Sequence, residues 1–190
     1  MSKDAPRIEF RTRPALRDWL ARHHATSGSV WCVTFKKHHP DCLPFGEVVE
    51  ELMCWGWIDS SVRGVDDDRM MHLISPRKDS SAWSAVNKAI VERMRATGQM
   101  TDAGEAKIAA AMANGMWEFL DDVERLERPA DLEAALTGTL LARWEAYPRS
   151  VKRGTLEWIK QAKTPPTRAK RIADVAASLA EGLRPSPFRR

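Results

Sequence analysis

The chain has 190 residues, of which 43% are hydrophobic and 29% charged, and its formal net charge is +4. These proportions are those of ordinary folded proteins, and eight tryptophans supply large apolar side chains, so wholesale disorder is excluded. No run of about 18 apolar residues occurs, and no apolar run follows the charged N-terminal residues. We therefore expect neither a membrane span nor a secretion signal.

The first predicted elements form a small unit of strands and helices. They are a strand at 8–10, a helix from Thr12 to before Gly28, a strand over 30–37, a helix over 45–55, and strands over 57–65 and 69–74. In the helix over 45–55, apolar residues recur at helical spacing, and the glutamates at 47, 50 and 51 are predicted to face solvent. Asp66, Asp67 and Asp68 predict an acidic hairpin turn.

Helical periodicity dominates from Ser80 onward. Trp83, Val86, Ile90 and Met94 form one apolar stripe, which Gly98 ends. Further helices are predicted over 101–114, 117–126, 131–136 and 140–147, from 150 onward, and from Thr164 onward. The fold class is therefore α+β. We expect a single domain over 1–190, with an αβ subregion at 8–79, a helical subregion at 80–182 and a frayed tail at 183–190.

The three cysteines, Cys32, Cys42 and Cys54, are odd in number and lie ten and twelve residues apart. This spacing fits neither a disulfide framework nor paired zinc ligands. The histidines and cysteine at 38–42 likewise lack the separated pairs that hold zinc, so we expect no metal and no cofactor. Reduced thiols favour a cytoplasmic location.

The segment CWGWIDSS, residues 54–61, combines two tryptophans, a glycine, an acid and two hydroxyls. Its simplest interpretation is a buried corner between a helix and a strand, where the glycine takes a positive φ. Two alternatives stay open: a pocket in which Asp59, Ser60 or Ser61 meets a ligand, and catalysis by Asp59. An acid beside tryptophans is rarely buried without a partner.

The segment SPRKDSSAWSAVN, residues 75–87, is the second candidate region. It can be read as helix capping by Asp79, Ser80 or Ser81, or as an anion site at a helix start beside Arg77 and Lys78. A hairpin between the two regions would bring Asp59 toward Arg77. The predicted ligand-binding residues are therefore Trp57, Asp59, Arg77, Trp83, Ser84 and Asn87.

Basic residues concentrate at the C-terminal end, where residues 149–190 hold eleven Lys/Arg and three Asp/Glu. Such a run is usually a solvated helix surface, but clustered on one face it could hold phosphates. Lys163, Arg168 and Arg171 are the candidate surface residues. Nucleic acid is thus an alternative partner, although few aromatic residues accompany the charges, and base stacking is not favoured.

Four segments in order resemble one known family. They are GWIDS at 56–60, SPRKDSSAWSAVN at 75–87, GQMTDAG at 98–104 and AKTPPTRAKRI at 162–172. Together, over about Phe10 to Gly182, they resemble the YdeI/OmpD-associated (OmdA) family, also described as bacteriocin-protection proteins. The chain departs from the family pattern at Ser60, at Lys78 and Asp79, at Gln99 and at Pro166. The resemblance implies protection against bacteriocins or other antimicrobial peptides, without an established reaction.

Three functions follow from these observations. The favoured one is a cytoplasmic, non-catalytic stress-protection or binding protein, for which no catalytic residue is assigned and whose ligand is an unknown small molecule or peptide. The second is an enzyme in which Asp59 acts as a base and Arg77 holds an anionic substrate. The third is a binder of nucleic acid or of an anionic surface through the C-terminal helices. The sequence does not predict the oligomeric state.

Overall fold

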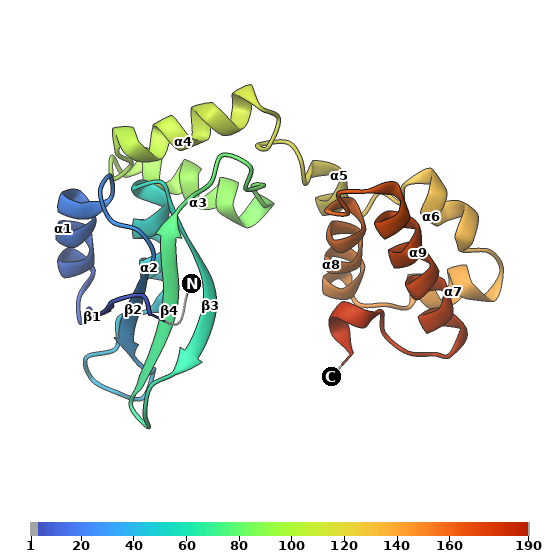
Figure 1. Ribbon diagram of the computed structural model, residues 1–190, viewed down its shortest axis with the longest axis horizontal. Coiled ribbons are helices and arrows are strands. Elements are labelled where there is room, and N and C mark those ends of the chain that lie inside the picture. Colours follow the sequence, from blue (N-terminus) through green and yellow to red (C-terminus); the bar gives the residue numbers. More distant parts are fainter. Residues whose placement is uncertain (1–3, 190) are drawn as a thin grey trace. The chain divides into compact units, whose positions relative to one another are not determined.

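The computed structural model describes residues 4–189 and divides the chain into two compact units (Figure 1). The first unit extends to Phe119 and the second begins at Leu120. The first holds a sheet and four helices and the described part of the second is helical, so the predicted α+β class is confirmed. The helical subregion predicted over 80–182 begins within the first unit. The single domain over 1–190 stays a prediction.

The first unit is built on a four-stranded sheet. Its strands are β1 (Arg7–Glu9), β2 (Val30–Phe35), β3 (Trp57–Gly64) and β4 (Arg69–Pro76), in the order β1-β2-β4-β3. β1 and β2 are parallel, whereas β4 is antiparallel to both of its neighbours. A parallel pair needs a crossover connection, which α1 (Arg13–His23) provides.

The acidic turn between β3 and β4 forms as predicted. The Oδ1 atom of Asp66 accepts hydrogen bonds from the backbone N–H groups of Asp68 and Arg69, at 3.1 and 2.7 Å. A short acidic side chain that bonds its own turn fixes the chain reversal. The hairpin register also contains an irregularity between Asp59 and Val62, which changes the pairing in the middle of β3.

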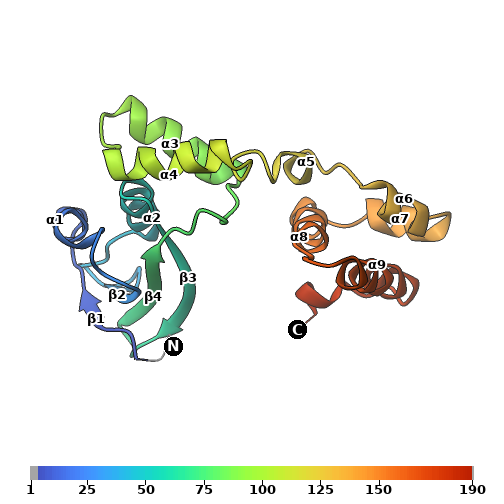
Figure 2. The ribbon, with the colours of Figure 1, turned by 45° about the horizontal axis from the view of Figure 1, so that its top comes forward.

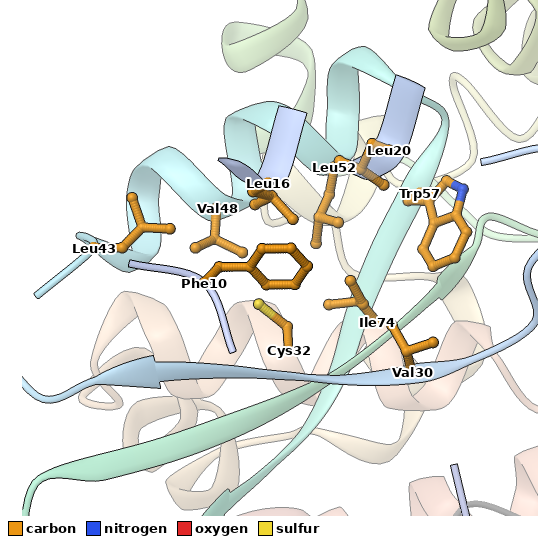
Figure 3. Close-up of a cluster of buried hydrophobic side chains, with 10 residues drawn as sticks. All are labelled: Phe10, Leu16, Leu20, Val30, Cys32, Leu43, Val48, Leu52, Trp57 and Ile74. Atoms are coloured by element: carbon orange, nitrogen blue, oxygen red, sulfur yellow. The ribbon is translucent and has the colours of Figure 1, made fainter. Parts of the chain in front are cut away.

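The first core lies between one face of the sheet and the helices α1 and α2 (Phe45–Cys54) (Figure 3). The side chains that fill it are Phe10, Leu16, Leu20, Val30, Cys32, Leu43, Val48, Leu52, Trp57 and Ile74. Leu16 and Leu20 come from α1 and are fully buried. Burial of such apolar surface is the main stabilising contribution to the unit.

A second core joins α2 to α3 (Ala85–Ala96) and α4 (Asp102–Ala113). Its buried members are Met53, Cys54, Trp83, Ile90, Val91, Met94, Ile108 and Ala111. The predicted apolar stripe is right for Ile90 and Met94 but wrong for Val86, which is 68% exposed. Ser84 caps α3, so Val86 lies in the first helical turn, before the part of the helix that packs.

Glu51 is fully buried, which corrects the prediction that it faces solvent. Its two carboxylate oxygens accept hydrogen bonds from Arg13 and Arg17 of α1, at 2.7 and 2.8 Å. The same arginines also donate to Gln99, Arg13 to the side-chain oxygen and Arg17 to the backbone oxygen. The buried acid therefore links α1, α2 and the turn before α4.

The segment GQMTDAG sets the distance between α2 and α4. Thr101 caps α4 and also donates from its hydroxyl to the carbonyl of Cys54, at 2.6 Å. Gly104 lies so close to α2 that an added Cβ would collide with the same Cys54 carbonyl and with the sulfur of Met100. A side chain at this position would push the helices apart.

The described part of the second unit is helical (Figure 2). Its elements are α5 (Asp121–Glu124), α6 (Ala130–Ala135), α7 (Thr139–Glu145), α8 (Arg149–Lys160), α9 (Pro165–Ala180) and a 3-10 turn η1 (Ser186–Phe188). α9 packs against α6, α7 and α8. Its buried residues Ile172, Val175 and Leu179 lie on the predicted face.

The tail over 183–190 was predicted to fray, but its described residues pack on the helices of the second unit. Asp174 accepts hydrogen bonds from the backbone and the hydroxyl of Ser186. The ring of Phe188 lies against Gly154 of α8, where an added Cβ would meet it. Gly154 of α8, which leaves room for the ring, and Asp174 of α9, which bonds Ser186, therefore hold the tail in place.

We predict that Glu51→Gln lowers the free energy of unfolding by about 3–5 kcal/mol, because it removes the buried charge that both arginines bond; Arg13 keeps its ion pair with Glu50, whereas Arg17 loses the carboxylate that it bonds. Glu92→Gln is the matched control. Glu92 is 68% exposed and pairs with Arg95 on the surface of α3, so its loss should cost about 1 kcal/mol or less. Urea titrations of the two variants measure the difference. Equal effects would contradict the role given to Glu51.

We also predict that Gly104→Ala lowers the free energy of unfolding by about 1–3 kcal/mol, since its new methyl group meets a backbone oxygen that cannot easily move. Gly46→Ala, in α2, meets nothing within 4 Å. That control should raise the stability by about 0.5–1 kcal/mol through helix propensity alone. Thermal unfolding checks both, and a stabilised Gly104→Ala variant would show that the close approach of α2 and α4 is not required.

Candidate functional site

The corner after α2 is a structural feature. Gly56 has a φ of +67°, and an added Cβ would collide with Lys107 and with the carbonyl of Ala103. Trp57, which follows it, is 1% exposed, belongs to the first core, and donates from its indole N–H to the carbonyl of His24, at 3.2 Å. Trp57 therefore closes the core, as the simplest interpretation of CWGWIDSS predicts.

Arg77 is the unusual residue of this region. It directly follows β4, its side chain is 2% exposed, and its backbone N–H donates to the carbonyl of Gly56 at 2.9 Å. Its Nη2 donates to the carbonyl of Ala82 at 2.6 Å, and its guanidinium lies 3.8 Å from the centroid of a ring of Trp83. The loop from Arg77 to Ser84 therefore curls around a buried cation.

Two of the three guanidinium nitrogens of Arg77, Nε and Nη1, are buried without a hydrogen-bond partner. Burial lowers the pKa of Arg77 to about 10, and the negative charge of Asp59 opposes this shift. A buried charge with unsatisfied donors costs free energy, because water no longer solvates it. Such a group in a folded protein calls for a physical explanation.

Asp59 lies on β3 opposite Ile74 and is half-buried. The negative charge of Asp59 acts on Arg77, but Asp59 accepts no hydrogen bond from the buried Nε and Nη1 atoms. The predicted approach of Asp59 and Arg77 is thus electrostatic proximity without a direct ion pair. A carboxylate at this range partly offsets the free-energy cost of burying the guanidinium, but it does not satisfy the guanidinium's hydrogen-bond donors.

His72, on β4, is a second buried polar side chain with an unpartnered atom, and the sequence interpretation missed it. It is 7% exposed, its Nε2 atom has no partner, and the ring of Phe45 stacks on it at 3.8 Å. Burial lowers the pKa of His72 below its ordinary value of 6.5, and the charge of Asp59 again opposes the shift. One signal could have revealed it. His72 lies two residues before the inward-facing Ile74 on β4, and residues two apart on a strand share a face.

The remaining predicted site residues lie at the start of α3. Ser84 is the N-cap, and its hydroxyl accepts from the backbone N–H of Asn87 at 3.3 Å. The prediction that Asp79, Ser80 or Ser81 caps this helix is therefore wrong. Asp79 instead pairs with Lys107 at 2.8 Å, which fixes the loop onto α4. Asn87 is half-buried in the first turn.

The basic residues of the second unit are largely engaged within it. Arg168 forms two hydrogen bonds with Asp131, at 2.6 and 2.9 Å. Arg171 donates to the carbonyl of Trp158 and lies 5.1 Å from the centroid of its ring. Of the three predicted surface residues, Lys163 is the one classed as exposed.

Acidic helices neutralise the C-terminal bases. Residues 120–148 hold seven Asp/Glu and three Lys/Arg, opposite in balance to residues 149–190. The pairs that join the two segments include Lys160 with Asp122, Arg153 with Glu124, and Lys152 with Glu145. Much of the basic charge therefore stabilises the second unit and is not displayed to a polyanion.

Two of the cysteines, Cys32 and Cys54, are buried. Burial raises the pKa of Cys32 to about 12, and burial with the charge of Glu51 raises that of Cys54 to about 11. Both thiols are therefore protonated and unreactive at neutral pH. Over residues 4–189, no group of three or more His, Cys, Asp or Glu side chains is placed to hold a metal ion.

Four surface cavities lie away from Arg77. Two in the second unit, of about 280 and 480 Å³, share Arg168 in their walls. A third of about 230 Å³ lies beside Trp158 and Arg171. One of about 330 Å³ in the first unit is lined by Phe35, Leu43 and Phe45 among others. None of these four is lined by Asp59, Arg77 or Trp83.

Family models match both units. Residues 8–107, more than half of the chain, match the model described as Domain of unknown function (DUF8412). The chain belongs to this DUF8412 family. The match contains β2 to β4, most of β1, α1 to α3 and part of α4, and thus Asp59, His72, Arg77 and Trp83.

Residues 125–182 match the model described as Bacteriocin-protection, YdeI or OmpD-Associated (OmdA), so the chain also carries an OmdA domain. The predicted OmdA resemblance is confirmed for this stretch. The segments at 56–60, 75–87 and 98–104 fall within the DUF8412 match instead. No curated protein and no solved structure matches the chain at a significant level. In the part of the chain described, no helix has both the length and the apolar character of a membrane crossing.

We predict that Asp59→Asn lowers the pKa of His72 further, because it removes the negative charge that favours the imidazolium. A pH titration of the histidine resonances by NMR, with His72→Gln to assign the signal, measures this shift. Asp67→Asn, at the exposed hairpin turn, is the control that should leave the pKa unchanged. An unchanged or raised His72 pKa in Asp59→Asn would contradict the proximity of the two groups.

Proposed function

We propose that this protein is a non-catalytic binding protein of the stress response that contributes to resistance against bacteriocins or other antimicrobial peptides. The description of the OmdA model supports the protective role. Binding is supported by the buried Arg77, whose two unpartnered nitrogens can be satisfied by a ligand. We place the ligand site at Asp59, Arg77 and Trp83.

The observation that carries the proposal is the unpaired charge of Arg77. A structural arginine in a core normally bonds a carboxylate, as Arg13 and Arg17 do with Glu51. Arg77 bonds a single carbonyl instead. Sites that bind ligands often keep such unsatisfied groups, because the ligand completes them.

Capture of cationic peptides by the second unit is a less suitable mechanism. Over residues 120–189 this unit holds thirteen Lys/Arg and ten Asp/Glu, and several of the acids are already paired with neighbouring bases. Positive charge repels cationic peptides. We therefore propose that protection is indirect and depends on the ligand of the first unit. The free cysteines support a cytoplasmic location.

An enzyme acting through Asp59 and Arg77 is the second candidate. The proximity of a half-buried carboxylate to a buried guanidinium favours it, since the guanidinium could hold an anionic substrate while Asp59 accepts a proton. The high pKa values of Cys32 and Cys54 remove these two thiols as nucleophiles. Turnover of a bound ligand by the wild-type protein would favour this candidate over the binding protein.

A nucleic-acid binder is the third candidate, and the ion pairs of α8 and α9 weaken it. Binding to a polyanion would have to compete with Asp131 for Arg168 and with Asp122 for Lys160. Each phosphate contact should also steepen the dependence of affinity on salt. Fluorescence anisotropy with a labelled oligonucleotide at two salt concentrations separates this candidate from the other two.

We predict that Arg77→Met abolishes the protective effect. A strain that lacks the gene is complemented with wild type, Arg77→Met or Arg63→Met and challenged with a bacteriocin and a cationic peptide. Arg63 is exposed on β3, outside the site, so its variant should restore survival as wild type does. Survival restored equally by Arg77→Met would overturn the proposed function, provided that immunoblots show equal protein levels.

A further inference from the structure

A cavity of about 330 Å³ lies at the start of α2, away from the proposed ligand site. Its wall combines Phe35 at the end of β2, Leu43 and Pro44 before α2, Phe45 at the first position of α2, and Met70 of β4. Small-molecule sites in proteins commonly have volumes of about 300–1,000 Å³ and largely apolar walls. The size and the lining of this cavity are therefore those of a site for a small apolar molecule.

The cavity continues the first core. Thr34 and Met70, which line it, lie directly opposite each other on β2 and β4. Thr34 follows Cys32 of the first core by two residues, so both side chains are on the sheet face that this core covers. Leu43 belongs to the core and lies at one end of it (Figure 3). An apolar ligand in the cavity would therefore extend the core and gain from the same burial of apolar surface.

Phe45 is a partly exposed part of the cavity wall. This large apolar side chain is 37% exposed, and its ring stacks on that of His72, with the ring centroids 3.8 Å apart. His72 is buried beneath it, and its Nε2 atom has no hydrogen-bond partner. A ligand that packs on Phe45 removes apolar surface from water and alters the packing on the imidazole. The resonances of His72 therefore report whether the cavity is occupied.

Lys37 is the charged residue of the cavity wall. Its side chain is exposed, and within residues 4–189 its ammonium group forms no ion pair or hydrogen bond. The neighbouring Lys36 differs, because its ammonium group donates to the carbonyls of Asp66 and Asp67, at 2.7 and 2.9 Å. Lys37 can therefore pair with a negative charge that a ligand brings.

The start of α2 adds partial positive charge at the same place. Its N-cap is Pro44, which gives no side-chain hydrogen bond, and both Pro44 and Phe45 belong to the cavity wall. The first N–H groups of a helix have no partner within it and favour a nearby anion. Glu47 in the first turn compensates part of this charge but is not in the cavity wall. The helix start therefore supplements Lys37, which remains the main cationic group.

We propose that this cavity binds a small monocarboxylic acid with an apolar body, such as 4-phenylbutyrate or octanoate. The apolar body packs on Phe35, Leu43 and Met70, and the carboxylate pairs with Lys37 beside the start of α2. A monoanion suits the site because Lys37 is the charged group of the wall, and a second negative charge would be left uncompensated. The cavity is separate from the ligand site proposed at Arg77, so either proposal can fail without the other.

Cys42 allows occupancy to be measured in the purified full chain. This half-buried thiol lines the cavity, whereas the thiols of Cys32 and Cys54 are buried and protonated, so iodoacetamide should modify Cys42 first. We expect 4-phenylbutyrate and octanoate to slow this alkylation and to shift the NMR signals of His72. Acetate, which lacks the apolar body, and sodium chloride at the same ionic strength are the references and should do neither.

Calorimetric titration of variants assigns the binding to the cavity. Cys42→Phe fills the cavity and should abolish binding, and thermal unfolding checks that this variant folds. Lys37→Met removes the cation and should weaken the binding of 4-phenylbutyrate about two- to fivefold, which is the effect of an exposed ion pair. It should leave the binding of the neutral analogue 4-phenylbutanol unchanged. Lys163→Met, at an exposed lysine of the second unit, is the matched control and should bind as the wild type does.

Three results would overturn the inference. In the first, neither acid slows the alkylation of Cys42 or gives a heat of binding above the chloride reference. In the second, a folded Cys42→Phe variant binds the acids as tightly as the wild type, which places them outside the cavity. In the third, 4-phenylbutyrate and 4-phenylbutanol bind the wild type equally and Lys37→Met changes neither, which removes the assignment to carboxylic acids.

Discussion

The first unit depends on one buried acid and the two arginines that compensate it. Glu51 is fully buried in α2, yet both of its oxygens are bonded by Arg13 and Arg17 of α1. The shared acceptor Gln99 extends the link to the turn before α4. Burial of a carboxylate is tolerated only with such compensation, so these contacts restrict how the helices can be arranged on the sheet.

That arrangement positions the candidate site. Once α2 is in place, its C-terminal carbonyl at Cys54 bonds Thr101 and lies against Gly104 of α4. Gly56 then turns the chain into β3, and its own carbonyl receives the N–H of Arg77. Glu51 and Arg77 thus contrast: Glu51 is compensated by two arginines and serves the fold, while Arg77 keeps two nitrogens without partners and is the residue of the proposed ligand site.

The fold could be predicted from the sequence where local patterns decide it. The caps at Thr12, Thr101 and Thr164, the acidic turn and the stop at Gly56 are local, and the structure has each of them. Long-range partners could not be predicted. Helical spacing placed Glu51 outside because its arginines lie over thirty residues earlier, and His72 looked like an ordinary strand residue.

The same limit applies to the second unit. Its C-terminal bases suggest an anionic partner when they are counted along the chain. In the structure the acids of α5 and α6 meet many of them, as Asp131 meets Arg168. For the candidate site, the approach of Asp59 toward Arg77 could be inferred from the hairpin, but the missing hydrogen-bond partners of Arg77 required coordinates.

A crystal structure of the purified protein tests the central claim most directly. The account predicts a bound molecule within hydrogen-bond distance of Nε or Nη1 of Arg77. A direct Asp59–Arg77 ion pair, with no bound molecule beside the guanidinium, would contradict it. Arg77 would then be a second compensated charge of the scaffold, like Glu51.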